Sequence, residues 1–291
     1  MKKDKMLLFG GTGLIGTRIQ ELLLEKYNII APNRMELDLM NKRAIKSFIG
    51  NRKFHVIVYA AGVTKQDVAE RKHEIADKLN SLAVGWIANI ARLTSTPVVY
   101  FSTDAVFKGD KDDSPYRETD KVEPVNYYGI SKARGENLVL STSNNNLVLR
   151  LSSVFTGKYE RKIDLARKIV EKLSKREECF GIIDQFMTLT FSDDAAFGLL
   201  SAIKKNIKGI LHLSSTDSIS NYNFARLIAI KFNYDENLVI PCKMEEFFKD
   251  GVKRSKYGWL DTTKAQKVLG KNILHSNTQN ISKFFLQYDR K

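Results

Sequence analysis

The chain of 291 residues is 43% hydrophobic and carries a formal net charge of +14. Its apolar content provides a buried core and excludes a disordered chain, while two cysteines and four scattered histidines argue against a disulfide framework or a zinc site. No apolar run approaches the roughly 20 residues of a membrane span and no secretory signal is visible, so we expect a cytoplasmic protein without a membrane span.

The first half alternates short apolar runs with amphipathic segments, which is typical of a parallel sheet with helices on both faces. The expected elements, in chain order, are a strand at Lys5–Phe9, a helix at Leu14–Lys26, a strand at Tyr27–Ala31, a helix capped by Asn41 and ending at Ile49, a strand at His55–Ala60, a helix at Lys72–Leu93, a strand at Val98–Phe101, a helix at Tyr127–Leu140 and a strand at Asn146–Leu151.

Beyond Ser153 the pattern loosens. It predicts helices at Arg161–Lys175, Asp193–Lys205, Tyr222–Phe232, Thr262–Leu269 and Thr278–Gln287, and a late strand at Gly209–Leu213. We therefore expect an α/β fold, a Rossmann-type doubly wound parallel sheet with a smaller, mostly helical C-terminal substrate lobe. Residues 1–155 would form the Rossmann domain, to which the chain returns around residues 190–215, and residues 156–291 would form mainly the second lobe.

A glycine-rich turn links the first expected strand to the first expected helix. Gly10, Gly13 and Gly16 form a G-x-x-G-x-x-G pattern, which lets a pyrophosphate approach the free N–H groups of a helix start. A purely structural turn is the alternative. The position between strand and helix favours a dinucleotide site, and its expected contacts are Gly10, Thr12, Gly13, Leu14, Ile15 and Gly16.

The segment after the second strand indicates which dinucleotide binds. It reads Ala31-Pro32-Asn33-Arg34 and lacks the carboxylate that NAD sites usually place there. Arg34 could pair with a 2′-phosphate, although an exposed loop arginine is the alternative. We predict that NADP(H) is preferred, with NAD(H) as the alternative.

A Y-x-x-x-K spacing points to proton transfer. Tyr128 and Lys132 lie one helical turn apart, and no other tyrosine has a lysine four residues on. A neighbouring lysine stabilises a phenolate and lets the tyrosine act as a general acid. Thr103, at the end of the preceding strand, would hydrogen-bond a substrate carbonyl, so we predict these three residues to be catalytic.

Taken together, the chain resembles extended short-chain dehydrogenases, and most closely the dTDP-4-dehydrorhamnose reductase family. The resemblance runs along nearly the whole chain. It rests on Ala60-Ala61-Gly62-Val63-Thr64 with the following Asp67, Ala69 and Glu70, on Ser102-Thr103-Asp104-Ala105-Val106-Phe107-Lys108-Gly109, on Pro115-Tyr116-Arg117-Glu118, on Pro124-Val125-Asn126-Tyr127-Tyr128-Gly129, on Asp184-Gln185-Phe186 and on Leu260-Asp261.

The resemblance implies further site residues. Cofactor contacts would include Asn33, Arg34, Asp38, Leu39, Ala60, Ala61, Gly62, Asn80, Ser102, Tyr128 and Lys132. Substrate contacts would include Thr64, Asp104, Val106, Phe107, Ser153, Gln185 and Phe186. The implied reaction is NADPH-dependent reduction of the C4 ketone of a nucleotide-linked 4-keto-6-deoxyhexose, in the biosynthesis of deoxysugars and cell-surface polysaccharides.

Two segments depart from the family pattern on the substrate side. Ser153 replaces the family's tryptophan, and Met187 and Leu189 replace the glycine and proline of a later loop. The sugar and the base therefore stay open, and a reductase or epimerase of another nucleotide sugar is an alternative. Another is a non-catalytic NADP-binding regulatory subunit, like that of methionine adenosyltransferase.

The expected partners are a nucleotide-sugar substrate and, by analogy, a second copy of the chain. Lysines and arginines are spread along the sequence, so we expect solvated surfaces and no nucleic-acid partner. No metal ligands are predicted, although some relatives hold Mg²⁺ at a subunit interface.

Overall fold

The structure, a computed structural model, describes residues 3–50, 52–159, 161 and 163–288. Its main feature is a six-stranded parallel sheet with the strand order β2-β1-β3-β4-β5-β10. The strands β3 and β4 are buried at every residue, which explains their nearly continuous apolar sequence. The six strands are β1 (Asp4–Phe9), β2 (Tyr27–Ile30), β3 (Val56–Tyr59), β4 (Val98–Thr103), β5 (Leu147–Leu151) and β10 (Gly209–His212).

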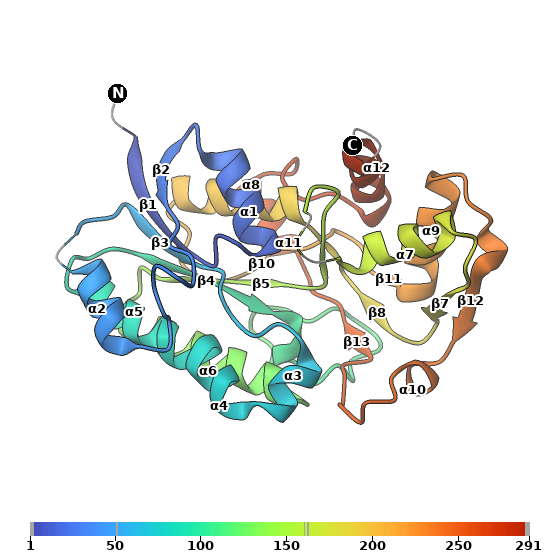
Figure 1. Ribbon diagram of the computed structural model, residues 1–291, viewed down its shortest axis with the longest axis horizontal. Helices are drawn as coiled ribbons and strands as arrows, with labels where there is room; N and C mark the ends of the chain where they lie inside the picture. Colours follow the sequence, from blue (N-terminus) through green and yellow to red (C-terminus); the bar gives the residue numbers. More distant parts are fainter. Residues whose placement is uncertain (1–2, 51, 160, 162, 289–291) are drawn as a thin grey trace.

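Helices cover both faces of this sheet (Figure 1). One layer, packed through a core cluster with β1, β3, β4, β5 and β10, contains α1 (Leu14–Leu23), α8 (Ser192–Lys204) and α11 (Thr263–Leu269). The opposite layer contains α2 (Lys42–Ile49), α3 (Gln66–Arg71), α4 (His73–Asp77), the π-helix η1 (Lys78–Leu82), α5 (Ala83–Arg92) and α6 (Tyr127–Thr142).

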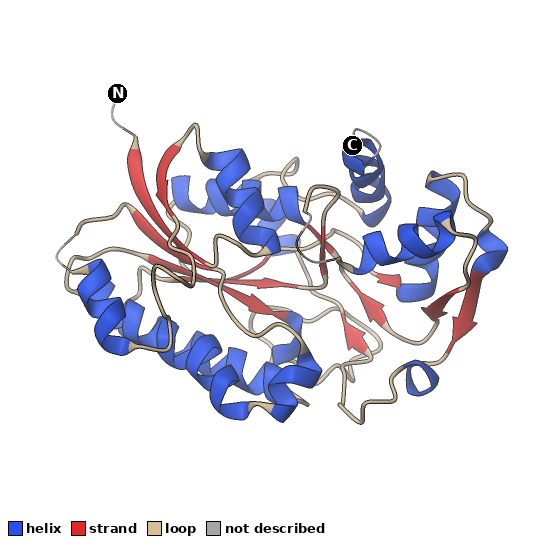
Figure 2. Cartoon of the chain, in the orientation of Figure 1, coloured by secondary structure: helices blue, strands red, loops and turns tan. Residues whose placement is uncertain are grey.

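A smaller lobe lies beyond the carboxyl ends of the strands (Figures 1 and 2). Its apolar cluster is built mainly from aromatic and aliphatic side chains of its helices. The helices are α7 (Leu165–Ser174), α9 (Asn221–Lys231), α10 (Met244–Phe247) and α12 (Asn277–Tyr288), with the 3₁₀ turn η3 (Glu236–Leu238). Short strands pair as β6 (Val154–Phe155) with β9 (Thr190–Phe191), β7 (Cys179–Ile182) with β12 (Val239–Cys242), and β8 (Phe186–Met187) with both β11 (Ile219–Ser220) and β13 (Tyr257–Gly258).

The predicted fold class is confirmed, and the structure corrects several details. The helix expected over Lys72–Leu93 is three segments, because η1 inserts a π-helical turn between α4 and α5. The helix expected from Arg161 begins at Leu165, because the Asp164 side chain accepts the Arg167 N–H as its cap. The Asn41 cap is confirmed, since its Oδ1 accepts the Ala44 N–H at 3.1 Å.

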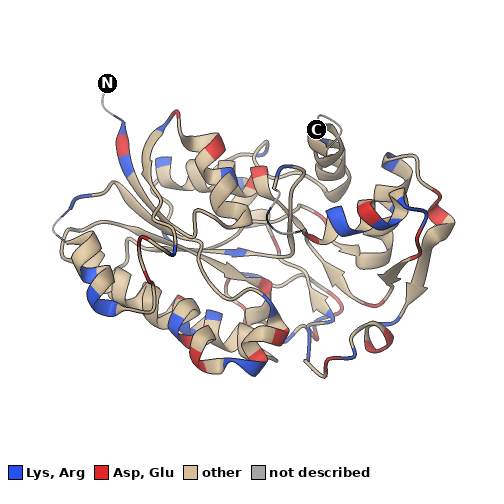
Figure 3. Cartoon of the chain, viewed as in Figure 1, with Lys and Arg blue, Asp and Glu red and all other residues tan. Residues whose placement is uncertain are grey.

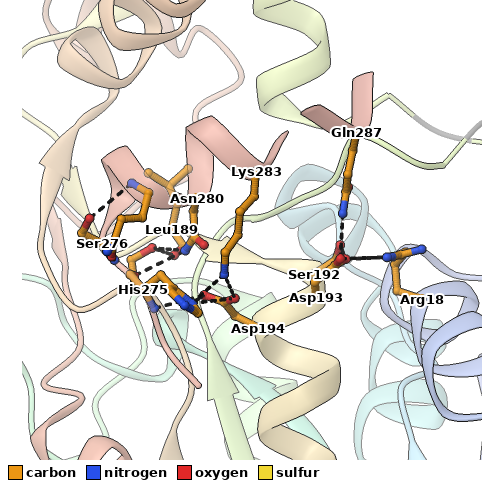
Figure 4. Close-up of polar contacts among 12 residues, drawn as sticks. Arg18, Leu189, Ser192, Asp193, Asp194, His275, Ser276, Asn280, Lys283 and Gln287 are labelled. Carbon is orange, nitrogen blue, oxygen red and sulfur yellow. Dashed lines mark hydrogen bonds and ion pairs between the residues drawn. The ribbon is translucent and has the colours of Figure 1, made fainter. Parts of the chain in front are cut away.

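A polar cluster at the start of α8 joins three helices (Figure 4). The Arg18 guanidinium of α1 donates to both oxygens of Asp193 at 2.8 Å, and Gln287 of α12 donates to the same carboxylate at 2.7 Å. The neighbouring Asp194 accepts from Lys283 of α12 and pairs with His275. These contacts fix α12 and the smaller lobe against the large sheet's helices.

Charged residues are distributed over both helix layers and the smaller lobe (Figure 3). None of the helices among the described residues combines the length and apolar character that crossing a membrane requires. The same residues contain no group of three or more His, Cys, Asp or Glu side chains placed to hold a metal ion.

Candidate active site

Four strands of the large sheet end at the same edge, and each is followed by predicted site residues. β1 leads into Gly10, β3 leads into Ala60, β4 ends at Thr103, and β5 is followed by Ser152 and then by the predicted Ser153. Parallel strands bring their carboxyl ends together, which is where ligands bind in open α/β sheets. The topology therefore assembles the candidate site from segments that are far apart in the sequence.

The glycine turn leaves the start of α1 open. Gly10 has φ +85°, and a Cβ there would lie 2.5 Å from the Ala61 nitrogen, while a Cβ on Gly16 would overlap the Gly10 carbonyl. Gly13 precedes α1 without a side-chain cap, and the first turn carries no acidic residue. Thr12, Leu14 and Ile15 complete this turn. The arrangement fits a diphosphate, because the backbone N–H groups of a helix start point toward it.

The Tyr159 hydroxyl donates to the Thr12 carbonyl at 2.9 Å, which ties a loop of the smaller lobe to this turn.

The loop after β2 is held by its own side chains. Asn33 Oδ1 accepts the N–H groups of Met35 and Glu36, and Arg34 is exposed beside them. An exposed guanidinium at the end of β2 is available to a 2′-phosphate. Farther along this loop, Asp38 is exposed and Leu39 packs against a core cluster.

Asn80 connects the loop after β3 to α6. Asn80 lies in the π-helix η1. Its Oδ1 accepts the Val63 N–H at 2.9 Å, and its Nδ2 donates to the Ser131 hydroxyl at 2.9 Å. Gly62 has φ +154°, and a Cβ there would overlap the Asn80 amide oxygen. Asn80 therefore supports the loop that carries Ala60, Ala61, Gly62 and the exposed Thr64.

Tyr128 and Lys132 lie one turn apart on α6, which is capped by the Asn126 side chain. Lys132 is 5% exposed; its Nζ donates to the Phe101 carbonyl at 2.5 Å and lies 4.0 Å from the Tyr100 ring centroid. Burial lowers the pKa of Lys132 to about 7. Burial raises the pKa of Tyr128 to about 12, with a hydrogen bond to Thr103 acting in the opposite direction. Tyr128 therefore keeps its proton at neutral pH, as a general acid must.

Thr103 is oriented by the partly buried carboxylate of Asp104. Its hydroxyl donates to Asp104 Oδ1 at 2.8 Å, and the Ser152 hydroxyl donates to Oδ2 at 2.8 Å. Burial raises the pKa of Asp104, and these two hydrogen bonds oppose the increase. Asp104 accepts from both hydroxyls and thereby fixes the orientation of the Thr103 hydroxyl next to Tyr128. Ser102, just before Thr103, is 5% exposed.

The other residues predicted to contact substrate, besides Thr64 and Asp104, differ in exposure. Ser153 is exposed after β5, and Gln185 and Phe186 are partly buried at the start of β8. In contrast, Val106 and Phe107 are 0% and 1% exposed. Their side chains pack in an apolar cluster with Tyr116, Ala133 and Leu260, and their contact with a substrate stays a prediction.

Sequence reasoning missed three features around this site. Tyr100 lies under Lys132, and a fully buried ion pair joins Glu136 of α6 to Arg150 of β5. Phe186 stacks with Tyr257 of β13 at a centroid distance of 5.9 Å, and Trp259 packs against both. The signals available in the sequence were a charged residue inside an apolar strand and the i, i+4, i+8 spacing of Tyr128, Lys132 and Glu136.

Comparisons with known proteins identify the family of this chain. The family model of the RmlD substrate binding domain matches residues 4–288. The dTDP-4-dehydrorhamnose reductase of Aggregatibacter actinomycetemcomitans is 32% identical over 279 residues, which cover 91% of this chain and 93% of the relative.

Two further relatives bear on the cofactor and on the alternatives. The crystal structure of dTDP-4-dehydrorhamnose reductase from Bacillus anthracis in complex with NADP has a TM-score of 0.91 and 28% identity, covering 98% of this chain and 99% of that one. Methionine adenosyltransferase 2 subunit beta of Xenopus laevis is 29% identical over 252 residues, or 81% of this chain and 75% of the relative. The resemblance seen in the sequence is thus confirmed, and the chain belongs to the dTDP-4-dehydrorhamnose reductase family.

Proposed function

We propose that this protein is an NADPH-dependent reductase of the C4 ketone of a nucleotide-linked 4-keto-6-deoxyhexose. dTDP-4-dehydrorhamnose is the first candidate substrate, because the reductases of that name are relatives along nearly the whole chain. The observation that carries the proposal is the arrangement of Tyr128 and the buried Lys132 one turn apart on α6, beside Thr103 at the sheet edge that also holds the glycine turn.

The cofactor proposal is NADP(H). It is supported by the NADP complex of the Bacillus anthracis relative and by the exposed Arg34 where NAD sites usually carry a carboxylate. The glycine turn of residues 10–16 would hold the diphosphate, and Lys132 would hold the nicotinamide ribose. When bound, NADPH supplies the hydride.

The protein's own residues would supply the proton and stabilise the phenolate that its transfer leaves. Tyr128 donates its hydroxyl proton to the alkoxide oxygen that forms at C4. Thr103 and Asp104 hold the Tyr128 hydroxyl in place, and the charged Lys132 stabilises the phenolate that remains. The low exposure of Thr103 and Lys132, at 6% and 5%, limits the water that would compete for the proton.

The sugar and the base are the least constrained part of the proposal. Ser153 leaves a smaller and more polar side chain where the family has tryptophan. Phe186 with its neighbours Tyr257 and Trp259 offers an aromatic wall near Asp104, since a Cβ on Gly258 would lie 2.7 Å from an Asp104 oxygen. A base or a sugar ring could pack on such a wall.

The test is a panel of 4-keto-6-deoxyhexoses linked to dTDP, UDP and GDP, with NADPH consumption followed by absorbance and products identified by NMR. We expect turnover of at least one of these compounds, and we expect the dTDP-linked sugar to be the preferred substrate. Tight NADPH binding without turnover on any ketone would contradict the proposal and favour a regulatory role, like that of the methionine adenosyltransferase relative.

A further inference from the structure

The Lys132 ammonium is buried with few polar partners to replace its water. Among the contacts of the described residues, its Nζ has one hydrogen bond, to the Phe101 carbonyl, and rests 4.0 Å from the Tyr100 ring centroid. An ammonium carries three donors, so a single carbonyl does not replace its hydration shell. The face of an aromatic ring carries negative charge density and attracts a cation most strongly where water is excluded.

The Tyr100 ring is clamped in this position. It is 0% exposed, and its hydroxyl donates to the Asn80 carbonyl in the π-helix η1 at 2.5 Å. Gly135 on α6 makes room for this bond, because a Cβ there would overlap the Asn80 carbonyl and approach the Tyr100 hydroxyl to 2.7 Å. On its other side Tyr100 packs against Tyr59, at a centroid distance of 6.0 Å. The ring therefore has a fixed face to offer to Lys132.

We propose that Tyr100 is a positioning residue for Lys132, whose ring face holds the ammonium charged and within reach of Tyr128. The inference rests on the proposed function for the role of Lys132, but the contact can be measured without turnover. Burial raises the pKa of Tyr100 far above its usual value, so the ring acts as a neutral phenol and not as a counter-charge.

The other charged groups near Lys132 are engaged elsewhere and do not hold its ammonium in place. On α6 itself, the Glu136 carboxylate favours the charged lysine but is shared with Arg150 of β5 through two hydrogen bonds of 2.9 and 2.7 Å. Asp104 of η2 (Asp104–Val106) faces Tyr128. Tyr59 of β3 lies behind Tyr100. At the outer side of α6, Asp77 of α4 accepts from the Tyr127 hydroxyl and from Arg134. Glu70 of α3 accepts the Tyr127 N–H.

The test measures the pKa of Lys132 directly in the full-length protein. Lysines labelled with ¹³C at Cε are titrated by NMR, and the Lys132 signal is assigned as the one missing in Lys132→Arg. Tyr100→Phe keeps the ring face and should leave the pKa of Lys132 nearly unchanged. Tyr100→Leu removes the ring face and should lower that pKa by about one unit or more.

Tyr59→Leu is the matched control, because it opens a similar gap in the same core without touching Lys132. The inference would be overturned if Lys132 had the same pKa in Tyr100→Leu and in Tyr59→Leu. It would also be overturned if Tyr100→Phe lowered the pKa of Lys132 as much as Tyr100→Leu does. Thermal unfolding verifies that each variant is folded, and Tyr100→Met, which fills more of the volume, replaces Tyr100→Leu if the latter does not fold.

An activity profile separates this inference from the proposed function. In Tyr100→Leu the pH at which kcat declines on the alkaline side should fall together with the pKa of Lys132. If the wild type reduces no ketone while the NMR pattern holds, the proposed function fails and the Tyr100 contact stands. If the wild type is active but its Lys132 titrates identically in all variants, only the inference about Tyr100 fails.

Discussion

The buried ion pair between Glu136 and Arg150 allows a quantitative prediction for the substitution Glu136→Gln. Both side chains are nearly inaccessible, at 3% and 1% exposure, and the carboxylate accepts from Arg150 Nε and Nη2 at 2.9 and 2.7 Å. The Arg150 guanidinium also lies 4.9 Å from the Phe107 ring centroid. Glutamine keeps the shape of the side chain and removes its charge, so Arg150 would remain buried without a counter-ion.

The expected cost follows from that burial. Removing one partner of a buried pair typically costs about 3–5 kcal/mol. Glutamine retains one acceptor oxygen and the ring of Phe107 remains, so we expect the lower end, about 3 kcal/mol. In a chain of 291 residues, with an unfolding entropy of about 2.1 cal/mol/K per residue, this corresponds to a fall of roughly 5 °C in Tm.

Urea unfolding followed by circular dichroism measures this change. The double variant Glu136→Leu with Arg150→Met should regain most of the stability, because apolar side chains of similar volume often replace a buried ion pair without loss. A decrease in the free energy of unfolding below about 1 kcal/mol for Glu136→Gln would refute the reasoning, since Arg150 would then have found another partner or water.

Three further predictions concern the site. Gly16→Ala should abolish NADPH binding in a fluorescence titration, because the new Cβ would overlap the Gly10 carbonyl and push α1 away; binding at wild-type affinity would show that the turn does not hold the cofactor. Asp104→Asn can accept only one of the two hydroxyl protons, so we expect kcat to fall roughly tenfold to hundredfold with KM less affected in steady-state assays. Activity should decline as pH rises through about 7, because Lys132 then loses its proton, and a flat profile up to pH 9 would contradict a charged Lys132.

The parts of the site that sequence could predict depend on residues close together in the chain. The glycine turn and the Tyr128–Lys132 pair each span less than two helical turns, so spacing alone places their backbones. Thr103 was predicted from its position at the end of an apolar strand. These features need only the local periodicity and the rule that parallel strands end at one edge.

The remaining features depend on which strands and helices pack together. Glu136 pairs with Arg150 because β5 packs against α6. Tyr100 contacts Lys132 because β4 also packs against α6. The sequence also does not show that the Phe107 ring is 1% exposed and stacks on Tyr116 at a centroid distance of 4.4 Å. The two-residue strands of the smaller lobe are too short to give a periodic pattern.

The role of Tyr128 as proton donor is best tested by comparing the wild type with Tyr128→Phe, using NADPH and dTDP-4-dehydrorhamnose. We expect ketone-dependent consumption of NADPH by the wild type and a loss of roughly 10²–10⁴ in rate for the variant, with NADPH binding retained. Full turnover by Tyr128→Phe would contradict the account, because the proton would then come from a group other than Tyr128.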